Sequence, residues 1–519
     1  MPAILKNLDG RVALPILALA GCGVAIGVAI KCSQVLRGKT IAFLDKHRKD
    51  FPLKVASGFS YEDRISQLPD HLLSDILLRL DLIEAVRTRI LSKRWKDICK
   101  LMSKLNFDCC KMFGEIEDHG NYSFKHKGRF LKAVDQSLRL YSGQHVPYFI
   151  LTCCLGKEFA NVISRWMQSI AALGVEELLI KFCSPIHVDK NGNGSLVKHF
   201  PFPFELLFEA ASLKNLHLFA CVLRPSFKGQ FKSLQFLTLC MVPLDDGQLP
   251  SIFSSCPNLQ GLRVSHCKLP FRMDIIGVHL RLKFLFIESC HGVKEIDISA
   301  GNLTFFYCYT DEVIKHSLRF VPELENLSLS CNGSGTVPHL FSEVAKDCTQ
   351  LKQLLFQTKT DELQCIPLKM DMFSNLRILY LLIMFDSNNW MTNSKVDLLN
   401  LTPILDACPL LEQFRLLARC PGRNAKRGGA WPPRHHAHLK EMEFDGFRGT
   451  MNEIAFASFL LRSASELERL CIRSSYSTYS ADFTWTEHPD YEIYPEERQE
   501  IYKQLMGQAL SSKVNVIFS

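Results

Sequence analysis

One short, recurring pattern constrains the fold of this chain more than any other feature. From residue 175 onwards, an apolar residue is followed three positions later by leucine or a similar side chain, and two positions after that by a third apolar residue. Most steps between successive copies span 21 to 28 residues, with longer steps after residues 175 and 376. The copies begin at Val175, Leu213, Leu234, Leu259, Leu282, Leu324, Leu351, Leu376, Leu411, Leu439 and Leu467, and a weaker copy begins at Leu303. This spacing indicates a chain built from repeated units.

The length of the repeat predicts a leucine-rich-repeat solenoid with α/β architecture. Each copy is interpreted as a strand whose alternate residues point inward, followed by a return segment. The returns at 249–256 and 401–408 are expected to be helical, because Pro257 and Pro409 stand just after them, where proline ends a helix. One repeat cannot bury its apolar side alone, so stacking must create the core and a one-sided, curved parallel sheet. A doubly wound sheet would need longer spacings and a glycine-rich phosphate loop, and the sequence has neither.

Composition and cysteine usage place the chain in a broad class. Its 519 residues are 47% hydrophobic and 22% charged, which is typical of a folded protein of more than one domain. The net charge of +8 is spread along the chain, so we expect no nucleic-acid partner. The 20 cysteines are scattered and form no Cys-x-x-Cys pair, which indicates buried free thiols in a reducing compartment, the cytoplasm or the nucleus.

An apolar stretch lies close to the beginning of the sequence. Residues 12–30 carry no charge and are long enough to span a bilayer. Gly23 and Gly27 add a small-xxx-small spacing, and the excess of basic residues downstream would leave the rest of the chain on the cytosolic side. The stretch predicts a membrane anchor. A cleaved targeting peptide, or an unrelated apolar exon joined by an error of gene prediction, would give the same pattern.

Residues 68–95 predict a small helical unit ahead of the repeats. Pro69 suits a first helical turn, and Asp81 with Glu84 has the spacing of a capping box at a second helix start. A unit of about 40 residues is too small to bury its own apolar surface, so a leftover face should dock elsewhere. The apolar stripes consist of Leu72, Leu73, Ile76, Leu77 and Leu80, and of Val86, Ile90, Leu91, Trp95 and Ile98.

The residue string itself resembles the plant F-box motif. The resemblance runs through residues 63–65, 68–70, 86–88 and 91–95, and its central stretch reads LPDHLLSDILLRLDLIEAVRTRILSKRW. Residues 105–108 are similar to the first strand that follows this motif, and residues 438–450 are similar to an FBD module. The order of F-box, repeats and FBD is that of the plant F-box/FBD/LRR family. The domains expected are an extension at 1–60, an F-box at 61–104, repeats at 105–430, FBD-like repeats at 431–480 and a tail at 481–519.

The resemblance implies a function. A family member of this kind would be the substrate receptor of an SCF-type cullin-RING ubiquitin ligase, docking a Skp-family adaptor, and through it a cullin, while the repeats hold an unidentified target protein. The usual Leu-Pro-Thr-Lys turn is replaced by residues 80–83, LDLI, which puts the adaptor affinity in doubt. The adaptor-binding residues carried over from the motif are Leu68, Pro69, Leu72, Ile76, Leu77, Val86, Leu91 and Trp95.

Candidates for other chemistry have simpler interpretations. Residues 189–194 match the start of a calcium loop, but position 12 is Phe200 instead of glutamate. His435, His436 and His438 have no zinc-finger partners nearby, and residues 422–429 form a basic inter-repeat loop. We expect no catalytic residue, no metal site and no cofactor. The alternative function is a non-catalytic interaction scaffold with no ligase role, which the predicted anchor at residues 12–30 would tether to a membrane.

Overall fold

The structure is a computed structural model that describes most of the chain from residue 68 onwards. The described residues are 68–79, 85, 88–90, 92–100, 102–113, 124–141, 145–182, 187–188, 194–195, 200–224, 228–277, 279–311, 313–331, 335–363, 366–367, 370–384, 397–418, 435–479, 485–488, 493–509, 511 and 513–518.

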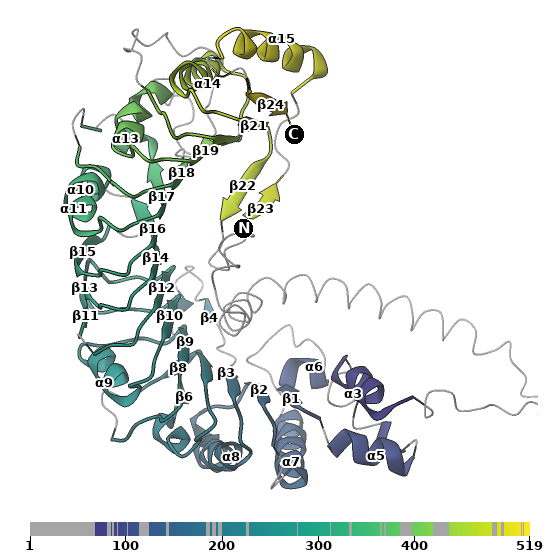
Figure 1. The fold of residues 1–519 in the computed structure, drawn as a ribbon. Helices are drawn as coiled ribbons and strands as arrows, with labels where there is room; N and C mark the ends of the chain where they lie inside the picture. The colour runs from purple at the N-terminus through teal and green to yellow at the C-terminus, as the bar shows by residue number, and fades with distance from the viewer. Residues whose placement is uncertain are drawn as a thin grey trace, which may run out of the picture.

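One long parallel sheet forms the inner side of a curved solenoid (Figure 1). Its 15 strands follow one another in chain order, so each strand between β1 and β24 pairs with the strand before it and the strand after it. This is the repeat architecture that the leucine spacing predicts. The strands are β1 (Lys104–Asp108), β2 (Tyr148–Cys153), β3 (Glu177–Phe182), β7 (Asn215–Phe219), β9 (Phe236–Cys240), β10 (Gly261–Ser265), β12 (Phe284–Glu288), β14 (Phe305–Tyr309), β16 (Asn326–Cys331), β17 (Gln353–Lys359), β18 (Ile378–Met384), β19 (Gln413–Ala418), β20 (Glu441–Asp445), β21 (Arg469–Arg473) and β24 (Asn515–Phe518).

The register of the strands aligns the repeating leucines. Leu237 of β9 pairs with Leu262 of β10, which in turn pairs with Leu285 of β12. All three side chains are buried in one continuous core between the sheet and the returns. Because successive residues of a strand point to opposite faces, the residues between the leucines face the inner side of the curve.

Helices cover the outer side of the sheet near both ends of the solenoid (Figure 1). The two returns expected to be helical are α9 (Gln248–Ser255) and α13 (Thr402–Asp406). Two longer helices are α8 (Ala160–Ala172) and α14 (Met451–Ser463). Helix α14 begins with a capping box, in which Thr450 and Glu453 bond each other's backbone N–H groups.

The middle repeats return through strands instead of helices. A second parallel sheet on the outer side consists of β11 (Arg272–Ile276), β13 (Glu295–Ser299) and β15 (Lys315–Phe320) (Figure 1). Successive leucine copies here start 21 to 23 residues apart, and a strand uses fewer residues than a helix to cross the same face. Side chains of β11 alternate between exposed and buried, which is the strand periodicity.

The helical unit stands at the first end of the sheet, where β1 begins (Figure 1). It comprises α3 (Asp70–Arg79), the short 3-10 helix η1 (Thr88–Ile90) and α5 (Lys93–Lys100). The first strand lies where the resemblance places it, and α6 (Cys109–Phe113) and α7 (Phe124–Leu140) follow. The core of the helical unit is continuous with that of the repeats.

The last residues contain structure where a tail was expected. A hairpin of β22 (Tyr476–Tyr479) and β23 (Trp485–His488) is followed by α15 (Pro495–Met506) and by β24, which pairs with β21 and extends the sheet. The smaller elements are η3 (Lys157–Phe159), β4 (His187–Val188), β5 (Gly194–Ser195), β6 (Phe200–Pro201), η4 (Phe204–Leu207), β8 (Cys221–Val222), α10 (Thr336–His339), η5 (Leu340–Val344), α11 (Ala345–Asp347), α12 (Thr360–Leu363) and η7 (Leu398–Leu401).

The predicted membrane anchor at 12–30 lies outside the described residues and stays a prediction. Within the part of the chain that the structure describes, no helix combines the length and the apolar character needed to cross a bilayer.

Candidate interaction surfaces

The first candidate surface is built on α3 and held in place by Arg94 of α5. The Arg94 guanidinium pairs with the Asp70 carboxylate at 2.6 Å and donates a second hydrogen bond, also of 2.6 Å, to the Leu68 carbonyl. The Pro69 carbonyl accepts from the backbone N–H groups of Leu72 and Leu73, which closes the first turn. These contacts join the Leu-Pro and Arg-Trp ends of the motif, which lie far apart in the sequence.

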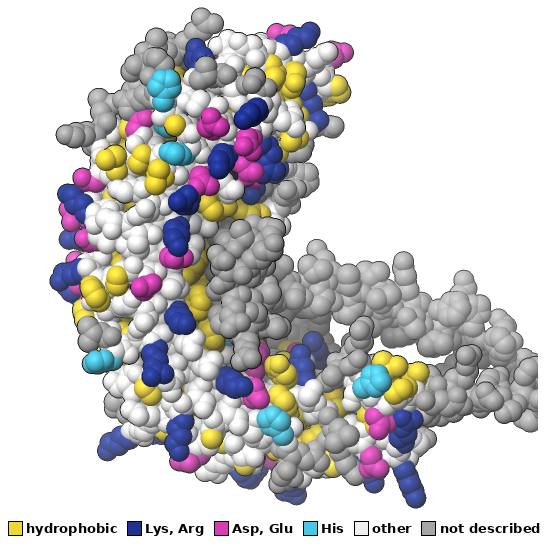
Figure 2. Space-filling model, viewed as in Figure 1, with side chains coloured by type: hydrophobic (Ala, Val, Ile, Leu, Met, Phe, Trp, Pro, Cys, Tyr) yellow, Lys and Arg dark blue, Asp and Glu magenta, His cyan; other side chains and the backbone are white. Residues whose placement is uncertain are grey.

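Helix α3 divides its apolar residues between two faces. Leu73 and Leu77 are fully buried in the chain's own core, whereas Leu72 is 41% exposed and Ile76 is 36% exposed. Both pairs have a spacing of four residues, so each pair forms a stripe along the helix. Figure 2 shows hydrophobic side chains gathered at the surface of α3. The exposed stripe is therefore available to another protein.

The predicted adaptor-binding residues fall into three groups. Leu72 and Ile76 are exposed, as is Pro69, and Leu68 is half-buried. Leu77 and Trp95 lie inside the chain, with Trp95 only 4% exposed. These two can support the surface but cannot form it in this conformation. The remaining two, Val86 and Leu91, lie outside the described residues, as does the unusual turn at 80–83.

The second candidate surface is the inner face of the repeat sheet. Its middle strands carry a row of buried aromatic side chains: the Phe236 and Phe284 rings stack at 6.3 Å, and the Phe286 and Phe305 rings stack at 5.3 Å. Gly261 lies between Phe236 and Phe284 in the register, and an added Cβ there would come within 2.3 Å of the Phe236 ring. The absence of a side chain at Gly261 therefore permits the stacking. Figure 2 shows hydrophobic side chains along this inner edge.

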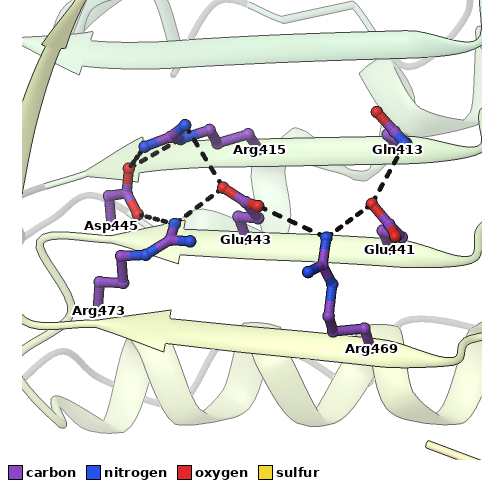
Figure 3. Close-up of polar contacts among 7 residues, drawn as sticks. All are labelled: Gln413, Arg415, Glu441, Glu443, Asp445, Arg469 and Arg473. Carbon is purple, nitrogen blue, oxygen red and sulfur yellow. Dashed lines mark hydrogen bonds and ion pairs between the residues drawn. The ribbon is translucent and has the colours of Figure 1, made fainter. Parts of the chain in front are cut away.

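The last repeats carry a charged network on the same inner face (Figure 3). Arg473 pairs with Glu443 at 2.8 Å and with Asp445 at 3.0 Å, and Arg415 also pairs with both carboxylates. Burial alone would raise the pKa of Glu443, but the hydrogen bond from Arg473 and the nearby arginine charges lower it. Three arginines and three carboxylates share this network, so it is nearly neutral as a whole. Its outer members are Gln413, Glu441 and Arg469, joined at 3.2 and 2.9 Å.

One group of side chains in the described residues has the geometry to bind a metal. The sulfur atoms of Cys109, Cys110 and Cys154 lie within 4.8 Å of one another, and those of Cys109 and Cys154 are 3.4 Å apart. This cluster was not predicted from the sequence, because Cys154 is distant in the chain and lies near the others only through the pairing of β1 with β2. Soft divalent ions such as Zn²⁺ prefer thiolate ligands.

Burial keeps several other titratable side chains in unreactive forms. Burial raises the pKa of Cys153 to about 12, as it does for Cys256 and Cys348, so these thiols stay protonated and inert. Of the three histidines at positions 435, 436 and 438, His436 is buried, and its backbone N–H donates a hydrogen bond to the Ser463 carbonyl. The calcium-loop residues 189–193 lie outside the described residues.

Some features of these surfaces were missed from the sequence alone. The alternation Glu441, Glu443, Asp445 within one strand could have indicated a charged inner face, since residues two apart share a face. Its arginine partners stand on other strands, about 28 residues away, and only the repeat register places them together.

Comparisons with known proteins agree with this architecture. The family model described as "At1g61320/AtMIF1, LRR domain" matches residues 138–501, and the F-box domain model matches residues 65–107. A putative F-box/LRR-repeat protein of Arabidopsis thaliana is 24% identical over 434 residues, which cover 78% of this chain and 89% of that protein.

Two further relatives from the same plant carry the FBD name. A probable FBD-associated F-box protein is 24% identical over 441 residues, covering 81% of this chain and 95% of the relative. An F-box/FBD/LRR-repeat protein is 32% identical over 216 residues, covering 40% of this chain and 44% of the relative. The similarity therefore extends across both the helical unit and the solenoid.

Proposed function

Because this chain belongs to the F-box/leucine-rich-repeat family of plants, we propose that it is the substrate-receptor subunit of an SCF-type ubiquitin ligase. The helical unit would bind a Skp-family adaptor and through it a cullin, and the repeats would bind a target protein. The observation that carries the proposal is the apolar stripe of α3, which the chain's own solenoid leaves uncovered.

The stripe has the chemistry of a docking site. Leu72 and Ile76 present aliphatic side chains at helical spacing, beside the half-buried Leu68. Full burial of an exposed leucine or isoleucine contributes about 1.5–3 kcal/mol, so covering the exposed part of Leu72 or Ile76 contributes roughly 0.5–1.2 kcal/mol. A few such anchors dominate most interfaces. Leu77 and Trp95 contribute indirectly, because they fix α3 against the rest of the chain.

The repeats would bind the target protein and would not catalyse a reaction themselves. Proteins of this family are typically non-catalytic. A target held on the inner face would be brought close to the ubiquitin-conjugating enzyme of the ligase, so that the reaction becomes effectively intramolecular. The charged network offers such a target polar contacts at partly exposed side chains, whereas the rings of the aromatic row are themselves buried.

The proposed location is the cytoplasm or the nucleus. Most cysteines whose burial the structure describes are buried, which suits thiols in a reducing compartment. If residues 12–30 span a membrane, the basic residues after them would place the F-box and repeats on its cytosolic side.

Affinity purification of the tagged full-length chain from plant extract, read by mass spectrometry, tests the proposal. The wild-type chain should recover a Skp-family adaptor and a cullin. The double variant L72D/I76D should lose both, whereas F271D, at a 64% exposed side chain of the solenoid, should retain them. Recovery of other proteins with no adaptor from the wild-type chain would favour the alternative, an interaction scaffold without a ligase role.

A further inference from the structure

The hairpin of β22 and β23 crosses the inner side of the solenoid (Figure 1). Its two strands pair antiparallel with each other and form a separate two-stranded sheet. In the described residues neither strand pairs with the main sheet, although the chain returns to that sheet at β24 immediately after α15. The hairpin is thus an excursion from the repeat pattern that places part of the chain over the inner face.

Trp485 fastens the hairpin to that face. Its indole ring meets the Tyr380 ring edge-on, with centroids 5.7 Å apart and planes at 86°. The Arg415 guanidinium lies over the same indole, 3.8 Å from its centroid. Leu355, Leu382 and Leu417 form an apolar cluster beneath, separate from the main core, against which Tyr380 and Trp485 pack.

These side chains of β17, β18 and β19 contact the Trp485 ring, and we call the place that the ring fills the Trp485 pocket. The pairing aligns Leu355 with Tyr380 and Arg415, and in the next row Leu382 with Leu417. On one side the equivalent position of β16 is Ser328, and on the other side the equivalent positions of β20 are Glu443 and Asp445. Gln357 of β17 completes the second row. Each row therefore holds two apolar side chains and one polar side chain, with polar neighbours at both sides.

The charged network holds Arg415, which forms one side of this pocket, in a fixed position. Arg415 is only 12% exposed and is paired with both Glu443 and Asp445 (Figure 3). These pairs use the edge of the guanidinium and leave its flat face for the indole. A cation–π contact is strongest when the cation is already desolvated and oriented. The pocket thus has an apolar floor, an aromatic edge and a cationic wall, which together suit a flat aromatic ring.

We propose that this pocket is a binding site for an aromatic side chain of the target protein, and that Trp485 occupies it in cis until the target arrives. The identity of the incoming protein rests on the proposed function, whereas the pocket and its cis occupant do not. The occupant inferred is a segment that presents a tryptophan, or a similar ring, with no net charge, because the adjoining network is nearly neutral.

The way in which the hairpin is anchored would allow an incoming aromatic ring to replace Trp485. A two-stranded hairpin alone in water is at best marginally stable, so its position depends on what Trp485 contacts. A tethered ligand acts at an effective concentration on the order of millimolar. A free ligand then binds only the fraction of molecules whose pocket is open, and its apparent affinity falls by that fraction. Removal of the Trp485 ring should therefore reveal a stronger site.

Titration of the purified full-length chain with N-acetyl-L-tryptophanamide, followed by saturation-transfer NMR and calorimetry, tests the site. W485A should bind this probe at least tenfold more tightly than the wild-type chain. T486A, at an exposed neighbour on the same strand, should behave as wild type. W485A/L417E should lose binding, and N-acetyl-L-alaninamide should not bind any variant. Equal binding of the tryptophan probe to wild type, W485A and W485A/L417E would overturn the proposal.

Hydrogen exchange of the wild-type chain covers the case in which W485A does not fold. A saturating tryptophan probe should speed exchange of the β22 and β23 amides, because the hairpin is displaced. Unchanged exchange of those amides at saturation would show a fixed structural strap and would overturn the proposal. Neither measurement involves the adaptor, so failure here leaves the ligase assignment standing, and loss of adaptor recovery would leave this pocket untouched.

Discussion

The helices before β1 and the repeats after it are rich in the same types of apolar residue, but the two regions bury these side chains to different extents. In the repeats, leucines such as Leu216 and Leu262 are fully buried, because their strands have a neighbour on each side and a return behind them. In α3, Leu73 and Leu77 are equally buried, while Leu72 and Ile76 remain partly exposed. Stacking completes the solenoid, but a short helical unit has too few neighbours to cover both of its apolar stripes. The uncovered stripe is what distinguishes a docking module from a self-contained one.

The largest effect is expected where the repeats depend on stacking. Leu262→Asp would place a carboxylate in the centre of the core with no partner, at a cost of several kcal/mol. We expect the cooperative thermal transition, followed by circular dichroism, to be lost or shifted far down in temperature. F271D, at an exposed site, should melt as the wild type does. A solenoid that tolerated L262D would not be held together by its leucine ladder.

Within α3, truncating a side chain of the buried stripe should destabilise the chain far more than truncating one of the exposed stripe. Leu77→Ala leaves a cavity in a fully packed site and should destabilise the chain by about 2–5 kcal/mol. Leu72→Ala removes an exposed side chain and should change the unfolding free energy by less than about 0.5 kcal/mol. Urea denaturation of the two variants measures both values. Similar losses for both would mean that the Leu72 stripe is covered by the chain itself.

A smaller effect is expected at the contact that joins the two ends of the helical unit. Arg94→Ala removes a partly exposed ion pair with Asp70 and a hydrogen bond to the Leu68 carbonyl. Such contacts together contribute about 1 kcal/mol. The change should also weaken adaptor binding several-fold, since the start of α3 would lose its tie to α5. Arg94→Lys should restore part of the stability but not the paired geometry. An unaltered adaptor affinity in R94A would show that this end of α3 is not part of the interface.

The smallest effect concerns acid sensitivity, which should belong to the repeats. Burial lowers the pKa of His217 to about 4 and that of His316 to about 3. The unfolded chain protonates these rings near pH 6.5 while the folded chain does not, so stability falls as the pH drops below about 6.5. The loss at pH 6 should be under about 1 kcal/mol for each ring. His316→Gln should flatten the dependence of the melting temperature on pH between 7 and 5, and an unchanged slope would contradict the assignment.

The sequence predicts the parts of this molecule that depend on local pattern. Leucine spacing predicts the parallel sheet, and Pro257 and Pro409 mark the ends of two helical returns. The strand returns of the middle repeats were not expected, because the repeat length alone does not determine whether a return segment is a helix or a strand. The terminal hairpin and β24 were missed, since residues 481–519 contain no copy of the leucine pattern.

The candidate surfaces were predicted less completely than the fold. The motif names Leu72, Ile76 and Leu77 together, and their spacing assigns all of them to one apolar side of the helix. Packing decides which of them turn inward, and that depends on elements such as α5 that lie far from α3 in the sequence. The pocket around Trp485 joins residues up to 130 positions apart, from Leu355 to Trp485, and no sequence pattern links them.

Calorimetric titration of the purified full-length chain with a purified Skp-family adaptor tests the central claim most directly. Wild type and F271D should bind with the same affinity, whereas L72D/I76D, with an unchanged melting temperature, should bind at least a hundredfold more weakly. Equal binding by all three proteins, or no binding by the wild type, would contradict the claim that the exposed stripe of α3 is the adaptor site.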